Sequence, residues 1–304
     1  MLYLEGHGVP HAPEGVAAAR AAGMRVAYVT NNASRPPAVV AERLTGLGIP
    51  AKPHEVVTSA QAAARVLAER VAEGAVVLVV GTAALADEVR RVGFEPVHAL
   101  ADAGEAGVAA VVQGLSPATC QRDLADAAVA LRTGAVWVAA NTDLTLPSVR
   151  GPLPGNGAFV AVLKLITGLE PLVAGKPDPA LHRESVERVA ARAPLIVGDR
   201  LDTDVLGAVR GGADSLLVMT GVTDRETLLA APPGSRPTYV STDLQGIAHA
   251  HPHVEVDVGG ARCGDAFATW KDGQVVVEGE GDDALRAEVA LSWALADAGR
   301  LPTG

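Results

Sequence analysis

Short apolar runs alternate with amphipathic stretches along most of the chain. Residues 13–23 are rich in alanine and end in a glycine, which predicts a helix with a C-cap. Residues 24–30 form a β-rich run, and residues 36–48 begin with proline and end with glycine, which predicts a strand and a second helix. This order of helix, strand and helix with tight connections is typical of a parallel sheet.

The middle of the chain repeats this rhythm independently. Apolar runs at 75–81, 108–114 and 135–141 alternate with helical patterns, and the first rhythm resumes at 171–182 and 193–199. The pattern predicts an α/β core interrupted by a second α/β domain. We expect the core to span 1–58 and 172–240 and the inserted domain to span 59–171.

The last sixty or so residues have a different pattern. Two β-like runs, 266–270 and 275–278, flank the turn sequence KDGQ and predict a hairpin. An amphipathic helix follows from Asp282. We therefore expect residues 241–304 to form a small α+β extension that packs on the core.

Composition narrows the possible functions. The formal net charge of -10 and the 3% aromatic content argue against nucleic-acid binding, which needs a cationic surface and stacking platforms. An acidic protein can still bind a phosphorylated small molecule if it supplies a local lysine, arginine or metal ion. No apolar run approaches the roughly 20 residues of a membrane span, and the thiols Cys120 and Cys263 have no metal-like spacing. These features predict a soluble, cytoplasmic protein.

Three apolar runs are followed by residues with candidate chemistry. Thr30 and Asp199 end two of these runs, and Lys176 lies just beyond the third. Ligands of open parallel sheets bind outside the carboxyl ends of the strands, so these groups could bind a phosphate and a divalent metal there. Taken singly, each has an ordinary structural explanation: a strand-end threonine, a surface lysine, and an aspartate that caps the helix after residue 200 together with Asp202 and Asp204.

The order of these segments resembles a known family. VTNN at 29–32, GKPDP at 175–179 and VGDRLDTD at 197–204 resemble motifs II, III and IV of the haloacid dehalogenase (HAD) superfamily. More narrowly they are similar to its class IIA branch, the NagD-like and p-nitrophenyl phosphatases. The segments 140–147 and 151–168 resemble the large cap of that branch and its return to the core. The resemblance implies a HAD-type Rossmann-like core, an inserted cap, and a cytoplasmic phosphatase that acts through an aspartyl-phosphate.

The resemblance also implies roles for individual residues. Thr30 would bind the phosphate with Asn31 and Asn32 beside it, and Lys176 would be the motif III cation. Asn141 and Asp143 would help the cap to close over the substrate. Asp199 would bind Mg²⁺, and Asp204 would support this metal site. The partners implied are a small phosphorylated metabolite and a second copy of the chain bound through the cap.

The aspartate pair of motif I is the part of the family pattern that this sequence does not contain. MLYLEG matches the end of that motif, which places the nucleophile and the acid/base aspartate just before residue 1. Glu5 follows the motif, and its use as nucleophile would need a different register. We expect a start codon assigned too late, with the enzyme otherwise intact. The alternative is a catalytically inactive relative that binds a phosphorylated ligand or a protein partner.

Two weaker patterns point to other chemistry. His249, His251 and His253 alternate and would share one face of a strand, but Pro252 interrupts the run, which favours a polar loop over a zinc site. The glycines at 155 and 157 lack the spacing of a dinucleotide-binding fingerprint. Neither pattern names a substrate.

Overall fold

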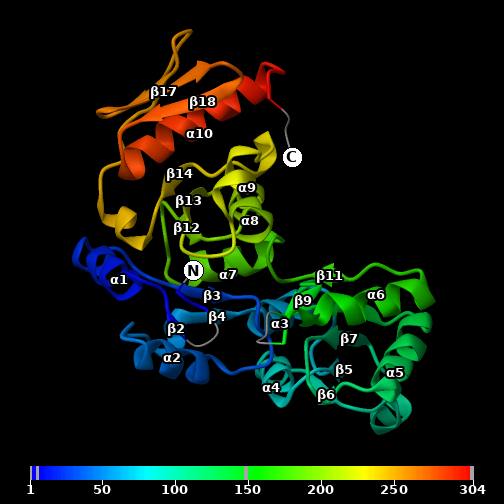
Figure 1. Cartoon of the computed structure of the whole chain (residues 1–304). Helices are drawn as coiled ribbons and strands as arrows, with labels where there is room; N and C mark the ends of the chain where they lie inside the picture. Colours follow the sequence, from blue (N-terminus) through cyan, green and yellow to red (C-terminus); the bar gives the residue numbers. More distant parts are fainter. Residues whose placement is uncertain (1, 5–6, 147–149, 302–304) are drawn as a thin grey trace. The chain divides into compact units, whose positions relative to one another are not determined.

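A computed structural model describes residues 2–4, 7–146 and 150–301 of the chain (Figure 1). Glu5, the weaker nucleophile candidate, lies outside the described residues. The chain forms two compact units. Unit 1 comprises Met1–Val26, Leu47–Ile49 and Ala191–Gly304, and unit 2 comprises Ala27–Gly46 and Pro50–Ala190.

Unit 2 is an α/β assembly built on parallel strands. Its main sheet has the order β11-β8-β7-β5-β6, with every pairing parallel, and β3 pairs with β4 in a separate parallel pair. Its strands are β3 (Tyr28–Thr30), β4 (Val56–Thr58), β5 (Val76–Val80), β6 (Glu95–Val97), β7 (Ala110–Gln113), β8 (Val136–Ala139), β9 (Thr145–Leu146), β10 (Leu153–Pro154) and β11 (Leu172–Val173). Its helices are α2 (Pro37–Gly46), α3 (Ser59–Ala68), α4 (Ala83–Arg91), α5 (Gln121–Arg132), α6 (Asn156–Thr167) and α7 (Pro179–Arg188), with the short helices η1 (Pro53–Glu55) and η2 (Leu100–Ala106).

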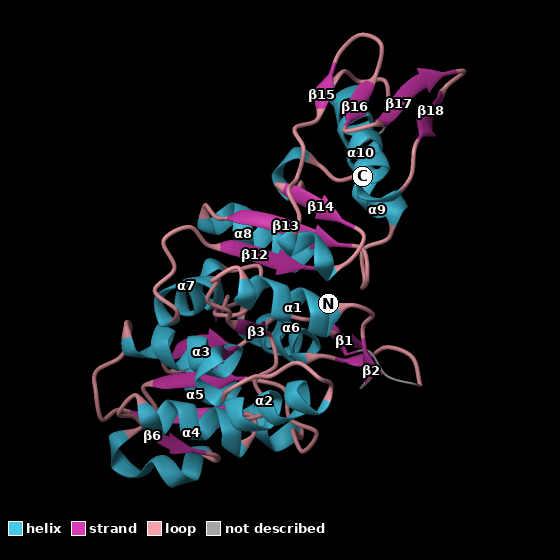
Figure 2. Cartoon of the chain, turned by 90° about the vertical axis from the view of Figure 1, so that its left-hand side faces the viewer, coloured by secondary structure: helices cyan, strands magenta, loops and turns pink. Residues whose placement is uncertain are grey.

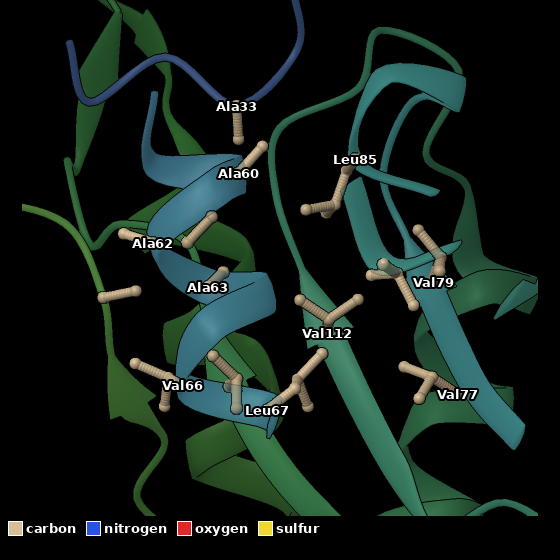
Figure 3. Close-up of a cluster of buried hydrophobic side chains, with 14 of the residues drawn as sticks. Ala33, Ala60, Ala62, Ala63, Val66, Leu67, Val77, Val79, Leu85 and Val112 are labelled. Carbon is tan, nitrogen blue, oxygen red and sulfur yellow. The ribbon is translucent and has the colours of Figure 1, made fainter. Parts of the chain in front are cut away.

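The continuous apolar sequence of β5 follows from helices on both faces of the main sheet. Val77 and Val79 belong to one buried cluster with residues of α3 and α4. Val76, Leu78 and Val80, which point to the other face, belong to a second cluster with residues of α5 and α6. Figure 3 shows the first cluster, in which the side chain of Leu67 on α3 lies close to that of Val112 on β7. Side chains of a strand alternate between faces, so a strand covered on both faces has to be apolar throughout.

The start of α3 is fixed by a reciprocal cap. The Thr58 hydroxyl accepts a hydrogen bond from the Gln61 main-chain N–H at 3.3 Å, and the Gln61 side chain accepts one from the Thr58 N–H at 3.1 Å. This capping box satisfies two N–H groups that the first helical turn leaves without partners. It therefore fixes the passage from β4 into α3 at Ser59.

Unit 1 contains a second parallel sheet of order β12-β13-β14, whose three strands lie side by side in Figure 2. Its strands are β1 (Tyr3–Leu4), β2 (His7–Gly8), β12 (Leu195–Gly198), β13 (Asp214–Val218), β14 (Tyr239–Ser241), β15 (Glu255–Val256), β16 (Ala261–Cys263), β17 (Ala266–Lys271) and β18 (Gln274–Glu278). Its helices are α1 (Ala12–Ala21), α8 (Leu206–Gly211), α9 (Arg225–Leu229) and α10 (Gly281–Asp297), with the short elements η3 (Leu201–Val205), η4 (Pro233–Ser235) and η5 (Leu244–Ala248). The element η3 is a single π-helical stretch that leads directly into α8.

The C-terminal part of unit 1 is an antiparallel sheet with one helix packed on it. Strands β15 to β18 pair in chain order, and α10 contacts β16, β17 and β18 (Figures 1 and 2). The predicted hairpin is confirmed, because β17 and β18 pair antiparallel from Phe267–Glu278 to Lys271–Gln274. Buried side chains of the sheet and of α10, among them Cys263 and Leu291, form a separate core cluster.

The predicted α/β class with parallel sheets is confirmed by the strand pairings of both units. The domain boundaries at 58–59, 171–172 and 240–241 stay a prediction. Among the described residues, no helix is both long and apolar enough to cross a bilayer.

Candidate active site

The loop after β3 is held by its own polar side chains. The Thr30 hydroxyl accepts a hydrogen bond from the Asn32 N–H at 3.1 Å, and Asn32 Oδ1 accepts from the Ser34 and Arg35 N–H groups at 2.9 and 3.1 Å. Such side chain to main chain bonds replace strand pairing where a chain turns. They fix the main chain of this loop at the carboxyl end of β3.

The side chain of Asn31 connects this loop to the segment after β11. Its Oδ1 accepts a hydrogen bond from the Lys176 N–H at 2.8 Å, and its Nδ2 donates to the Lys176 carbonyl at 3.2 Å. One amide side chain therefore holds the lysine main chain at both its N–H and its C=O. The two residues are 145 positions apart in sequence, and both are half-buried.

The segment after β8 joins the same cluster. Asn31 Nδ2 lies 3.2 and 3.3 Å from the two carboxylate oxygens of Asp143, and Asn141 Nδ2 donates to the Asn31 carbonyl at 2.7 Å. Asn141 is 5% exposed. The sequence predicted these residues at the site, and the structure brings them together with Thr30 and Lys176 in unit 2.

Two further residues of this cluster were missed by the sequence interpretation. Ser59 is fully buried, and its hydroxyl donates to the Asn31 carbonyl at 2.6 Å. Asn156 is 2% exposed and donates to the Asn141 carbonyl at 2.7 Å. Each of the two is the first residue of a helix, and a polar residue at a helix start by itself indicates only a cap.

Asp199 and Asp204 form a second cluster, in unit 1. Both carboxylates are almost buried, at 8% and 6% exposure. Asp199 Oδ2 accepts the Val222 N–H at 2.9 Å, and Asp204 Oδ2 accepts the N–H groups of Asp199 and Arg200 at 3.3 and 3.2 Å. The carboxylates are thus held against the main chain that follows β12.

Helix capping by the three aspartates is not what the structure shows. The residue before η3 is Arg200, and its side chain makes no cap hydrogen bond. Asp202 instead pairs with the Arg200 guanidinium at 2.9 and 2.6 Å, and its side chain is 65% exposed. Asp202 therefore belongs to the protein surface, whereas Asp199 and Asp204 are the buried carboxylates of this loop.

The donor chemistry of this second cluster fits magnesium. Mg²⁺ prefers hard oxygen ligands and is commonly held by one or two carboxylates, with water and substrate phosphate completing its shell. Asp199 and Asp204 supply such oxygens, and the described residues contain no group of three or more His, Cys, Asp or Glu side chains that could hold a metal. A structural zinc site needs four protein ligands, and the described residues contain no group of His, Cys, Asp and Glu side chains that would supply them.

The alternating histidines lie in the loop between η5 and β15 and do not form a strand. The ring of His251 lies against Tyr239, with 5.0 Å between centroids, and its Nε2 lies 2.9 Å from the Gly246 carbonyl. These contacts hold the loop against unit 1, so His251 has a packing role there.

The chain is similar to known phosphatases. A profile of haloacid dehalogenase-like hydrolases matches residues 1–95, and a second profile of HAD-like hydrolases matches residues 173–247. D-glycerol 3-phosphate phosphatase of Mycobacterium tuberculosis is 51% identical over 244 residues, which cover 78% of this chain and 68% of that protein.

Solved structures agree with the sequence similarity. Glycerol phosphate phosphatase from Mycobacterium tuberculosis in complex with magnesium has a TM-score of 0.86 and 44% identity, covering 97% of this chain and 87% of that chain. p-Nitrophenyl phosphatase from Archaeoglobus fulgidus has a TM-score of 0.72 and 30% identity, covering 80% and 92%. The two profile matches include Thr30, Asn31, Lys176 and both carboxylates of the second cluster, whereas Asn141, Asp143 and Asn156 lie in residues 96–172 between the matches.

Proposed function

The chain belongs to the haloacid dehalogenase-like hydrolase family, and from this membership we propose that it hydrolyses a small phosphate monoester with the help of Mg²⁺. It is by family a phosphoric monoester hydrolase. The observation that carries the proposal is the hydrogen-bonded cluster of Asn31, Lys176 and Asp143 at the end of β3. In this cluster the main chain of Lys176 is bound to the loop that carries the Thr30 hydroxyl, which supports a phosphate site at the end of β3.

Each residue of this cluster has a proposed part in binding phosphate. The Thr30 hydroxyl would donate to a phosphoryl oxygen, with the main-chain N–H of Asn31 beside it. The Lys176 ammonium would offset the negative charge that builds on those oxygens during transfer. Asn141 and Asp143 would shape the side of the site where the alcohol part of the substrate binds.

Asp199 and Asp204 would hold the metal ion. When bound, Mg²⁺ would neutralise charge on the phosphate and help to orient it. The two carboxylates keep their direction because main-chain N–H groups donate to them.

The covalent step of the proposed reaction needs two aspartates, one as nucleophile and one as acid and base. One carboxylate would attack phosphorus, the second would protonate the leaving alkoxide, and water would then hydrolyse the aspartyl-phosphate. Intact mass and N-terminal peptide mapping of the protein from its own host test this step: a peptide with DxDG ahead of LYLEG supports it.

D-glycerol 3-phosphate is the first substrate to test. The 51% identity with the enzyme named for that substrate supports this choice. Phosphate release should require Mg²⁺ and should be abolished by a chelator. Asp199→Asn should lose the response to Mg²⁺, whereas the matched variant Asp202→Asn, from the exposed part of the same loop, should keep it. Equal activity of both variants would contradict the assignment of the metal site.

A homodimer through the cap and a cytoplasmic location are also part of the proposal. Support for the dimer comes from α6, where the apolar side chains of Val162, Leu165 and Ile166 are 44%, 86% and 50% exposed. Sedimentation analysis should show a dimer that Leu165→Glu converts to monomer. A monomeric wild-type protein would exclude this interface.

A further inference from the structure

The stretch Gly155-Asn156-Gly157 has no part in the function proposed above, and it packs tightly on the segment after β8. The Gly157 N–H donates to the Asp143 carbonyl at 2.9 Å. A Cβ atom at Gly157 would lie under 3.0 Å from the Thr142 carbonyl. Only glycine allows the start of α6 to lie this close to the main chain of Thr142, which explains why a glycine follows Asn156.

Asn156 begins a chain of side-chain amides that ends at Lys176. Its Nδ2 donates to the Asn141 carbonyl at 2.7 Å, and Asn141 Nδ2 donates to the Asn31 carbonyl at 2.7 Å. Asn31 then holds Lys176 through the two main-chain hydrogen bonds of 2.8 and 3.2 Å. We call Asn156, Asn141 and Asn31 the amide chain.

We propose that the amide chain positions Lys176, with Asn156 as its buried anchor. The inference rests on the proposed function, because it assigns to Lys176 the role of phosphate-binding cation. A lysine ammonium is a point charge on a flexible four-carbon stem, so its location depends on how firmly the main chain at its base is held. Every link of the amide chain ends on a main-chain group, and the last link holds both sides of residue 176.

The burial of Asn156 argues for a specific purpose of its amide. A buried amide loses its hydration, and this cost is offset only where hydrogen bonds replace it. Nδ2 of Asn156 lies 2.7 Å from the Asn141 carbonyl and 3.4 Å from the Gln113 carbonyl, so the donor side of the amide is used. Leucine has the same branched shape and the same number of side-chain heavy atoms, and it would leave the Asn141 carbonyl without this donor.

The test compares Asn156→Leu with Thr133→Val. Thr133 donates a hydrogen bond of 2.8 Å to the Ala130 carbonyl at the end of α5, so the control also loses one hydrogen bond in the same unit. The measurements are kcat and KM for D-glycerol 3-phosphate, the Kd of inorganic phosphate by calorimetry with Mg²⁺ present, and stability by urea unfolding. We expect Asn156→Leu to raise both KM and the phosphate Kd about tenfold and to lower kcat about another tenfold.

The pattern of these changes separates positioning from general damage. Partial unfolding lowers kcat through the fraction of active protein and leaves KM and the phosphate Kd unchanged, which is the pattern expected of Thr133→Val if it has any effect. Unchanged KM and phosphate Kd in Asn156→Leu would overturn the inference. If Asn156→Leu does not fold, Asn31→Ala, at a half-buried position, takes its place with the same expected changes.

Failure of the proposed function would give a different result. A wild-type protein without phosphatase activity that still binds phosphate, and binds it about tenfold more weakly after Asn156→Leu, would contradict the proposed function and support the amide chain. A wild-type protein that neither turns over substrate nor binds phosphate would overturn both.

Discussion

Gly221→Ala should damage the metal site through one added methyl group. Gly221 lies beside Asp199, and a Cβ atom there would come under 3.0 Å from Oδ2, Cβ and Cγ of that aspartate. The loop is held in place, because the Val222 N–H donates to Asp199 Oδ2 at 2.9 Å and the Thr223 N–H donates to the Asp199 carbonyl at 3.0 Å. The added methyl group therefore has to displace the Asp199 side chain or break one of these bonds.

The size of the effect follows from these contacts. Ordinary contact begins near 3.4 Å, so the Asp199 carboxylate would have to move by more than about 0.4 Å. This exceeds the roughly 0.2 Å by which metal–ligand distances vary in well-formed sites. Overpacking costs about 1–3 kcal/mol and a lost hydrogen bond to a carboxylate about 1.5–3 kcal/mol, so either outcome should lower stability by about 1–3 kcal/mol. The Kd for Mg²⁺ should rise by about tenfold or more.

Calorimetric titration with Mg²⁺ and urea unfolding measure the two effects separately. Gly234→Ala is the matched control, because a Cβ atom at Gly234 would meet nothing within 4 Å and the residue belongs to the same unit. The control should bind Mg²⁺ as the wild type does and should lose little stability. If Gly221→Ala binds Mg²⁺ as tightly as Gly234→Ala, the reasoning that Asp199 is a metal ligand held by this loop is refuted.

Three further predictions concern charged groups. Lys176→Met should weaken the binding of inorganic phosphate by about tenfold or more in calorimetry, because the cation is lost while the length of the side chain is kept; unchanged affinity would exclude the lysine from the site. The hydrogen bond to Asp243, 2.5 Å long, raises the pKa of His11 above its usual 6.5, so the pair stabilises the protein fully below pH 6.5 and less as the pH rises through the raised value. Titration of the His11 ring by NMR should show that pKa returning toward 6.5 in Asp243→Asn. Burial raises the pKa of Asp282, but hydrogen bonds and the Arg286 guanidinium, 3.0 Å away, outweigh burial, so the pKa is lowered overall. The ionised Asp282 therefore stabilises the folded protein fully above pH 3.8, and this stabilisation is lost as the pH falls through the lowered pKa. Arg286→Leu should cost about 3 kcal/mol in urea unfolding at pH 7, since a half-buried carboxylate loses its cation.

Local patterns in the sequence predicted much of the fold. The apolar run of β5 and the turn between β17 and β18 are short-range signals, and both elements lie where the pattern placed them. The rule that ligand-binding residues follow parallel strands also predicted that the residues after β3 and β11 meet. Asn31 and Lys176 do meet through two hydrogen bonds, whereas the expected convergence with Asp199 stays a prediction.

Long-range polar contacts could not be predicted in the same way. Ser59, Asn141 and Asn156 reach the same main chain from three different segments, and the choice of partner depends on how those segments pack. Sequence reasoning expected one capped helix after Arg200, whereas the structure has the π-helical η3, which turns Asp204 back onto the strand end. Both outcomes depend on tertiary contacts that propensities do not contain.

The placement of the two thiols has a practical consequence. Cys120 is exposed at the start of α5, whereas Cys263 on β16 is fully covered by the α10 layer, and burial first of all raises the pKa of its thiol. Alkylation requires the thiolate, so an electrophile should label Cys120 at once and Cys263 only when α10 lifts from its sheet. Cys120 therefore serves as an internal reference for Cys263. The labelling rate of Cys263 relative to that of Cys120 reports how often α10 separates from its sheet while the rest of the chain stays folded.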